Sequence, residues 1–392
     1  MWKPYTHQNR QPVKVPADPV APVPDSPDRD VIVHVFGHTD VGRTREHNED
    51  SFVIVDLGND DASRPEATRT HRIGPRGALF MVADGLGGAA AGEVASELAV
   101  NTVHEELRER WVRAGGRGPD DFAAAIKAAA ETANGRIFAY AVEHPESRGL
   151  GTTATMAGLL EDTLYLAQVG DSRAYLVRDG VARQITRDQS LMQRLVDAGE
   201  LTQDEADRSE RRNIILQALG PEPSVKIDLT HQRLSRGDVL VLCTDGLSGL
   251  VKTEEIAEVI TQIPDLADAC RELVDRANEQ GGPDNITVIA ARFEGEGLSV
   301  AEQGDHVGHA VYRLPGSETP TEPHGEFVPR DRGKGTRASR ESGSAESTHA
   351  SGSRIWTMLL LTIVLVAALL LAVREMHDGS PAEGAETQVQ SR

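Results

Sequence analysis

The sequence predicts an α+β fold, since short strand-like segments occur in hairpin-connected groups and long helix-like segments separate those groups. The strand prediction comes from short segments that are apolar or that alternate between apolar and polar residues. They are residues 31–36, 51–57, 78–84, 152–160, 163–171, 174–178, 181–186, 225–230, 238–245 and 285–293. The hairpin prediction comes from Asp179-Gly180 between two of these segments, because this pair tolerates the positive φ of a tight turn.

The helix prediction comes from longer segments rich in Ala, Leu and Glu. They are residues 91–111, 121–144, 188–198, 202–219, 253–263 and 265–280. Ser, Thr or Asp precedes several of them and Gly281-Gly282 follows the last, as expected at helix boundaries. Segment 58–77 is polar and lies between two predicted strands, which predicts a long loop that is either disordered or functional.

Composition excludes several classes of protein. The chain has 392 residues and a formal net charge of −20, which disfavours nucleic-acid binding because that binding depends on Lys and Arg against phosphate. Two cysteines exclude a disulfide framework and a four-cysteine zinc site. We expect Cys243 and Cys270 to be small buried apolar side chains.

The chain divides into five predicted parts. Residues 1–30 form a proline-rich, disordered arm without the apolar segment of a secretory signal. Residues 31–293 form one globular domain, and residues 294–354, rich in Gly, Ser and Glu, form a disordered linker. Residues 355–373 form a transmembrane helix, followed by a short extracytoplasmic tail over 374–392.

The transmembrane prediction depends on 19 consecutive residues without a charge, which in a helix would extend roughly 28 Å. The alternative is a buried core helix, but the linker before it offers nothing to bury it in. Basic residues are concentrated before this segment, at Arg330, Arg332, Lys334, Arg337, Arg340 and Arg354. This asymmetry predicts a single-pass protein of the cell membrane whose globular domain is cytoplasmic.

Acidic residues stand at the ends of several predicted strands. They are Glu49 and Asp50, Asp84, Asp171, Asp245 and Asp284. If they converge, their repulsion requires a cation, and oxygen-only ligands favour a hard ion such as Mg²⁺ or Mn²⁺. The alternative is that each is an ordinary turn residue, as we expect for Asp179.

At these residues the sequence resembles the metal-dependent protein phosphatases of the PPM group, the type 2C serine/threonine phosphatases, in their bacterial form. The resemblance covers about residues 34 to 293 and rests on an ordered series of motifs. The series is Thr39-Asp40-Val41-Gly42, Arg45-Glu46-His47-Asn48-Glu49-Asp50-Ser51, Ala83-Asp84-Gly85-Leu86-Gly87-Gly88, Gly151-Thr152-Thr153, Val169-Gly170-Asp171-Ser172-Arg173, Thr244-Asp245-Gly246-Leu247 and Gly282-Pro283-Asp284-Asn285-Ile286-Thr287.

The resemblance implies an αββα sandwich of two antiparallel sheets flanked by helix pairs. It implies that Asp84 bridges two Mn²⁺ or Mg²⁺ ions, with the Gly85 carbonyl on one ion and Asp245 and Asp284 on the other. Glu49 and Asp50 would act through metal-bound waters, Asp171 would mark a weaker third metal site, and Arg45 would hold the substrate phosphate. A hydroxide that bridges the two ions would then hydrolyse phosphoserine or phosphothreonine.

Two features leave alternatives open. Leu86 stands where eukaryotic members often carry a histidine, so the general acid is not identified. Residues 187–220, which include Arg187, Gln189 and Ser190, resemble the flap of bacterial members beside the metal site.

Expected partners are phosphorylated proteins, namely membrane serine/threonine kinases and their substrates. The alternative is an inactive pseudophosphatase that binds phosphoproteins or senses metal.

Overall fold

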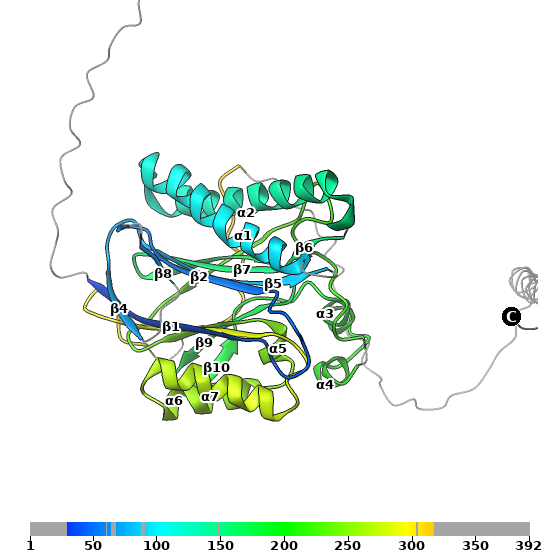
Figure 1. Ribbon diagram of the computed structural model, residues 1–392. Coiled ribbons are helices and arrows are strands. Elements are labelled where there is room, and N and C mark those ends of the chain that lie inside the picture. The colour runs from blue at the N-terminus through cyan, green and yellow to red at the C-terminus, as the bar shows by residue number, and fades with distance from the viewer. Residues whose placement is uncertain are drawn as a thin grey trace, which may run out of the picture. The chain divides into compact units, whose positions relative to one another are not determined.

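The computed structural model describes residues 30–316, except residues 60, 64–67, 88–90, 148, 210 and 303–304. Two antiparallel sheets lie face to face (Figure 1). Sheet A has the strand order β10-β9-β12-β13-β1-β4. Its strands are β1 (Val31–Asp40), β4 (Arg69–Ile73), β9 (Arg173–Arg178), β10 (Val181–Gln184), β12 (Val239–Cys243) and β13 (Ile286–Glu294).

Sheet B has the strand order β11-β8-β7-β5-β2-β3, with the short β6 paired to β5. Its strands are β2 (Asp50–Asp56), β3 (Asp61–Ser63), β5 (Ala78–Leu86), β6 (Gly151–Thr152), β7 (Ala154–Leu160), β8 (Thr163–Val169) and β11 (Asp228–Arg233). Every residue of β7 is buried, because this central strand is covered on both faces.

Helices cover the outer face of each sheet (Figure 1). The pair α1 (Ala91–Leu107) and α2 (Gly118–Glu143) packs on sheet B, with a π-helical turn over Arg108–Arg113 between them. The pair α6 (Thr253–Gln262) and α7 (Leu266–Glu279) packs on sheet A. Buried apolar side chains fill the space between the sheets, where Phe80 and Phe293 meet edge to face at 6.2 Å. The α+β class and the αββα layers are therefore confirmed.

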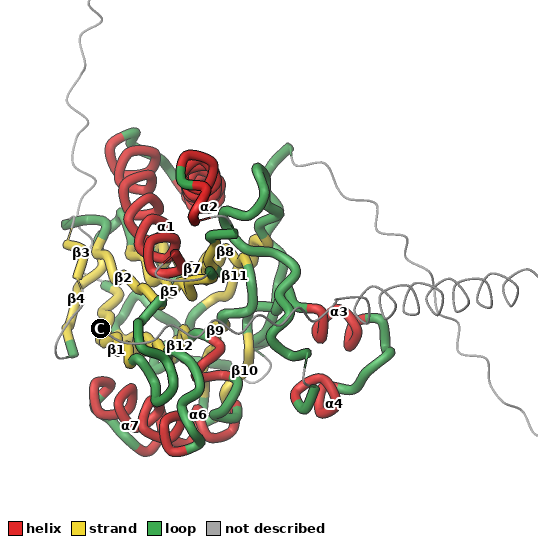
Figure 2. The backbone as a smooth tube through the Cα atoms, turned by 45° about the vertical axis from the view of Figure 1, so that its right-hand side comes forward, coloured by secondary structure: helices red, strands yellow, loops and turns green. Residues whose placement is uncertain are grey.

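The predicted helix over 202–219 is wrong beyond its first residues. Helix α3 (Leu191–Asp197) is followed by the short α4 (Gln203–Asp207), which begins at a Thr202 capping box. The chain then runs in turns and extended backbone to Leu219. Its backbone bonds go to residues 189–191 and to Thr152 instead of along a helix. Figure 2 shows α3 and α4 projecting from the body of the sandwich.

The prediction that 58–77 is a single polar loop is also wrong. Strand β3 pairs with β2 in sheet B, and β4 pairs with β1 in sheet A. The segment therefore leads from one sheet to the other and supplies an edge strand to each. Strand β4, Arg-Thr-His-Arg-Ile, has too few apolar residues to be identified from the sequence, which is common for edge strands.

The described residues that follow β13 pack on the domain, although the sequence predicted a disordered linker from residue 294. Leu298 and Val307 are buried between the sheets. The Tyr312 amide then donates to the Leu229 carbonyl at 2.8 Å, along the edge of β11. Few apolar residues secure this segment, so its composition resembles that of a linker.

No helix among the described residues is both long enough and apolar enough to cross a membrane. The predicted transmembrane segment 355–373, the tail 374–392 and residues 1–29 of the predicted arm lie outside the described residues.

Candidate active site

Five aspartates come from five separate chain segments. Asp50 begins β2, and it stands opposite Asp84 of β5 in the register of sheet B. Asp171 follows β8, Asp245 begins the short helix α5 (Asp245–Ser248) after β12, and Asp284 stands just before β13. Residues from both sheets thus contribute to one cluster, which we call the acid cluster.

The electrostatics of these residues show that they lie close together. Burial raises the pKa of Asp84 well above its usual range, and the carboxylates of the four other aspartates raise it further. Burial raises the pKa of Asp171 to about 8, with Asp245 as the next cause. Asp84 and Asp171 are therefore disfavoured in their ionised forms by neighbouring carboxylates, as expected for acids that share one site.

Asp50 connects the two sheets through hydroxyl donors. Its Oδ2 accepts hydrogen bonds from Thr244 Oγ1 at 2.8 Å and from Thr287 Oγ1 at 2.7 Å, and both threonines belong to the sheet A side. Burial raises the pKa of Asp50 to about 7, although these two bonds lower it. Neither threonine was predicted from the sequence to have a role in the site. Thr244 directly precedes Asp245 and Thr287 ends the last motif of the series, and a role in the site could have been predicted from these positions.

Two oxygens of the acid cluster lack a partner. Among the described residues, the buried Asp50 Oδ1 and Asp245 Oδ1 have no hydrogen bond. Burial raises the pKa of Asp245, with the Asp284 carboxylate as the next cause, while a hydrogen bond with Asp84 opposes the shift. Unpartnered buried carboxylate oxygens are costly unless a cation neutralises them. In the described part of the chain, no three His, Cys, Asp or Glu side chains gather tightly enough to enclose one ion.

Gly85 has no room for a side chain. A Cβ there would stand 2.2 Å from the Gly92 carbonyl oxygen and 2.5 Å from the Glu49 carbonyl oxygen. The Gly85 amide donates to that Glu49 oxygen at 3.1 Å. The start of α1, the end of β5 and the loop before β2 are therefore held together next to Asp84.

Arg45 lies on the loop between β1 and β2 and faces the acid cluster. Its Nη2 donates to Asp284 Oδ2 at 2.9 Å, and its Nη1 lies 3.9 Å from Glu49 Oε2. The side chain remains 46% exposed, so donors of its guanidinium stay accessible to an anion. The structure thus places Arg45 beside the predicted metal ligands, and its phosphate-binding role stays a prediction.

Asn285 fixes the loop that carries Arg45 and Glu49. Its Oδ1 accepts from the Glu49 amide at 2.8 Å, and its Nδ2 donates to the carbonyls of Val41 and His47. The sequence analysis quoted Asn285 as part of a motif and gave it no role. The His47 side chain is exposed.

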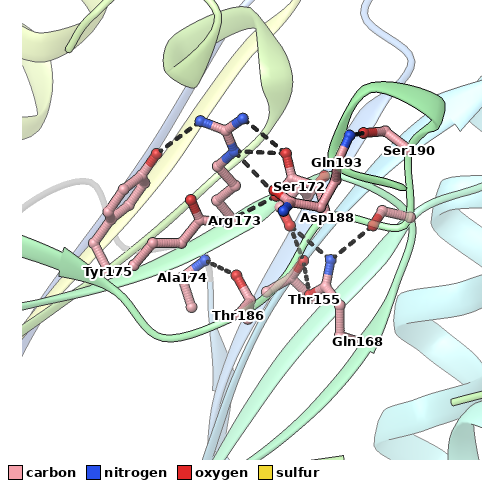
Figure 3. A network of polar contacts seen from close by, with 12 residues as sticks. Thr155, Gln168, Ser172, Arg173, Ala174, Tyr175, Thr186, Asp188, Ser190 and Gln193 are labelled. Carbon is pink, nitrogen blue, oxygen red and sulfur yellow. Dashed lines mark hydrogen bonds and ion pairs between the residues drawn. The ribbon is translucent and has the colours of Figure 1, made fainter. Parts of the chain in front are cut away.

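A polar network anchors the flap beside Asp171 (Figure 3). The Arg173 guanidinium donates from Nε and Nη2 to both carboxylate oxygens of Asp188, at 2.7–3.1 Å, and from Nη1 to Tyr175 Oη at 3.2 Å. Gln189 exchanges hydrogen bonds with the backbone of Gly170 at 2.9 and 3.0 Å. The base of the flap is therefore fixed to the strand end that carries Asp171.

The three flap residues named from the sequence have different positions. Gln189 makes the Gly170 contacts, and Ser190 caps α3 by accepting from the Gln193 amide at 3.2 Å. Arg187 pairs with Asp197 within the flap. Arg173 and Asp188 were missed as a pair, because nothing in their sequence separation indicates a buried bidentate contact.

The acid cluster suits hard divalent cations. In the described part of the chain, the donors are carboxylate oxygens, two of them buried without a partner, and no cysteine or histidine stands among them. Burial and mutual repulsion raise the pKa values of four of the five aspartates, and a bound cation would lower these pKa values again. Such a site can activate water and neutralise a phosphoryl group.

Comparison with known proteins gives a consistent picture. A family model described as protein phosphatase 2C matches residues 51–287. The serine/threonine phosphatase stp of Listeria monocytogenes is 34% identical over 257 residues, which are 66% of this chain and 94% of that protein. The crystal structure of the Mycobacterium tuberculosis serine/threonine phosphatase PstP/Ppp superposes with a TM-score of 0.56 at 36% identity, over 67% of this chain and 99% of that one. A PstP catalytic domain in complex with two manganese ions superposes with a TM-score of 0.55 at 34% identity, over the same shares.

Proposed function

This chain belongs to the protein phosphatase 2C family and is a serine/threonine protein phosphatase, and on that premise we propose that it acts at a membrane against serine/threonine kinases. The observation that carries the catalytic part is the acid cluster, in which burial and neighbouring carboxylates raise the pKa values of Asp50, Asp84, Asp171 and Asp245 together. Such a cluster is stable in its ionised form only with cations.

We propose two Mn²⁺ or Mg²⁺ sites and a weaker third. Asp84 and the Gly85 carbonyl would serve the first ion, and Asp84, Asp245 and Asp284 the second. Glu49 and Asp50 would act through intervening waters, and Asp171 with Asp245 would hold the third. Support for two ions comes from the related PstP catalytic domain, which is a complex with two manganese ions. When bound, divalent ions lower the pKa of water and neutralise charge on phosphoryl oxygens.

The chain's own residues orient the site. Thr244 and Thr287 hold Oδ2 of Asp50 and leave Oδ1 without a partner among the residues that the structure describes. Asn285 fixes the loop that presents Glu49 and Arg45, and Arg45 offers a charged, planar set of donors to the substrate phosphate. Preorganised donors of this kind are most of what phosphoryl transfer requires from the protein.

Membrane attachment is supported by the sequence of residues 355–373 and by the basic residues that precede it. Tethering would raise the effective concentration of the phosphatase near membrane kinases and their substrates. Extraction of membranes with alkaline carbonate tests this part. Recovery of the full-length chain in the soluble fraction would refute the anchor and leave the catalytic proposal intact.

The catalytic proposal is tested by release of phosphate from a phosphothreonine peptide with added Mn²⁺. We expect activity in the wild type, loss of at least a hundredfold in Asp84→Ala and Asp245→Asn, and no loss in Asp268→Asn. Asp268 is a suitable control because its side chain is 67% exposed and pairs only with Arg271 among the described residues. Absence of Mn²⁺-dependent activity in the wild type would refute the proposal.

A further inference from the structure

The return segment of the flap exposes two large apolar side chains. Ile214 and Leu216 are each 44% exposed. The other exposed large apolar side chains among the described residues are single valines: Val142, Val181, Val300 and Val311. Ile215 between them forms an antiparallel bridge with Ser190, and since the neighbours of a bridged residue point to the side opposite its own side chain, we treat Ile214 and Leu216 as one apolar surface.

The backbone of this segment is well fixed. The Leu191 amide donates to the Ile214 carbonyl and the Leu216 amide donates to the Gln189 carbonyl, at 2.8 and 2.7 Å. The segment then pairs with Thr152 through Leu219, with reciprocal backbone bonds of 2.8 and 3.0 Å. The exposed side chains are thus presented on paired backbone, which lowers the entropy cost of binding a partner.

The same segment leads to the acid cluster. Thr152, the residue that pairs with Leu219, donates from Oγ1 to the Asp84 carbonyl at 2.8 Å. Leu219 is therefore connected through Thr152 to a predicted metal ligand. Along extended backbone Leu216 is no more than about 10 Å from Leu219, and Ile214 no more than about 17 Å. A substrate whose phosphorylated residue occupies the acid cluster can therefore reach both side chains with its flanking residues.

Positive charge precedes the apolar surface. Residues 208–212 contain three arginines and one glutamate, on a chain of net charge −20. Arg211 and Arg212 are exposed, and neither forms an ion pair with any residue that the structure describes. By contrast, Arg45 is already engaged by Asp284 and Glu49, and Arg187 by Asp197.

We propose that residues 211–216 form a docking strip for the phosphoprotein substrate, and that the strip selects segments with an apolar residue and acidic residues flanking the phosphorylated threonine or serine. This inference rests on the proposed phosphatase function. Ile214 and Leu216 bind the apolar flank, and Arg211 and Arg212 bind the acidic flank. Positive charge here also offsets the repulsion between an acidic substrate and the rest of the acidic surface.

The test compares two substrates with the full-length enzyme and Mn²⁺. One is p-nitrophenyl phosphate, which is too small to reach the strip, and the other is a phosphothreonine peptide with Leu and Glu in its flanks. In Ile214→Ser/Leu216→Ser we expect the ratio of peptide kcat/KM to p-nitrophenyl phosphate kcat/KM to fall roughly tenfold, through KM, because apolar contact area is lost.

The salt concentration distinguishes the contribution of the arginines to peptide binding from that of the apolar pair. In Arg211→Gln/Arg212→Gln we expect the peptide KM to rise roughly tenfold at low salt and the deficit to shrink at about 0.5 M NaCl, where charges are screened. The deficit of the apolar variant should persist at that salt concentration. A peptide with Ser and Lys in place of Leu and Glu should show little difference between wild type and either variant.

Val142→Ser and Arg117→Gln are the matched controls, because both side chains are exposed on α2 or at its start. Equal peptide-to-ester ratios in the strip variants and the controls would overturn the inference. So would an equal loss on both substrates, or a loss of binding to anionic vesicles with unchanged peptide kinetics. A wild type that hydrolyses neither substrate would instead overturn the phosphatase function on which the inference rests.

Discussion

Replacement of Thr287 by valine should shift the pH dependence of metal binding. Thr287 Oγ1 donates to Asp50 Oδ2 at 2.7 Å inside the buried contact between the sheets. Valine has nearly the same shape and removes only the hydroxyl, so the carboxylate keeps its surroundings and loses one of two side-chain donors. Since this bond lowers the pKa of Asp50, its loss must raise that pKa.

The size of the effect follows from the bond that is lost. A hydrogen bond to a charged group contributes about 1.5–3 kcal/mol, which corresponds to a change in pKa of about 1 to 2. The pKa of Asp50 is about 7, so in the wild type without metal about half of the molecules carry it ionised at pH 7. In Thr287→Val the ionised fraction falls to roughly one in ten to one in a hundred. A carboxylate that holds an ion through water acts in its ionised form, so the apparent Mn²⁺ affinity at pH 7 should fall by up to roughly 5- to 50-fold.

Calorimetric titration with Mn²⁺ between pH 6 and 9 measures the apparent Mn²⁺ affinity of the wild type and the variant. The deficit of Thr287→Val should be large at pH 7 and shrink to about twofold or less at pH 9, where about half or more of the variant molecules carry Asp50 ionised. Thr230→Val is the matched control, because Thr230 is equally buried and its Oγ1 has no hydrogen-bond partner in the described part of the chain. A deficit that is constant across pH, or one shared by the control, would refute the reasoning.

Three further predictions concern stability and substrate binding. Burial raises the pKa values of Asp50 to about 7 and of Asp171 to about 8, so the folded state holds protons that the unfolded state releases near pH 4. Without divalent ions the free energy of unfolding should therefore fall by several kcal/mol between about pH 4 and pH 8, and Mn²⁺ should suppress that fall. Urea unfolding measures this free energy, and a value that does not change with pH would contradict the prediction. Arg45→Ala should raise the KM for a phosphopeptide roughly tenfold without weakening Mn²⁺ binding, as measured by steady-state kinetics and calorimetry, because it removes a phosphate donor but no metal ligand. Tyr312→Phe breaks the 2.7 Å bond to Asp120 and should cost at most about 1 kcal/mol, whereas Tyr312→Ala should cost about 2–4 kcal/mol if the segment after β13 is an integral part of the domain.

The sequence predicted the α+β class and the acids because both leave local signals, whereas the αββα layers came from the family resemblance. Apolar strands such as Ala78–Ala83 are recognisable by composition, and an acid at the end of each is recognisable by position. The convergence of Asp84, Asp245 and Asp284 was an expectation that the resemblance made specific, and the structure brings them together. Their individual roles toward each ion stay predictions.

The parts that could not be predicted depend on contacts between distant residues. Residues 208–219 have helix-like composition, yet Ile215 pairs with Ser190 and Leu219 pairs with Thr152 in isolated β-bridges. Strand β4 is too polar to be recognised and forms only because β1 offers it an edge. In the same way, Thr287 and Asn285 look like ordinary strand and turn residues, and only the folded chain shows that one bonds Asp50 and the other fixes the loop of Glu49.

The contacts of Asp50 imply that ion binding and sheet packing are coupled. Asp50 begins a strand of sheet B, while its two hydroxyl donors belong to the sheet A side, so the carboxylate is stabilised only when the sheets are docked. Burial in that contact is also what raises the pKa of Asp50. Ions that favour the ionised carboxylate therefore bind the docked arrangement more tightly than any opened one, and by linkage they must stabilise the sandwich. The acids that give the site its chemistry thus lower the stability of the metal-free domain, and both effects have the same origin in the burial of carboxylates between two sheets.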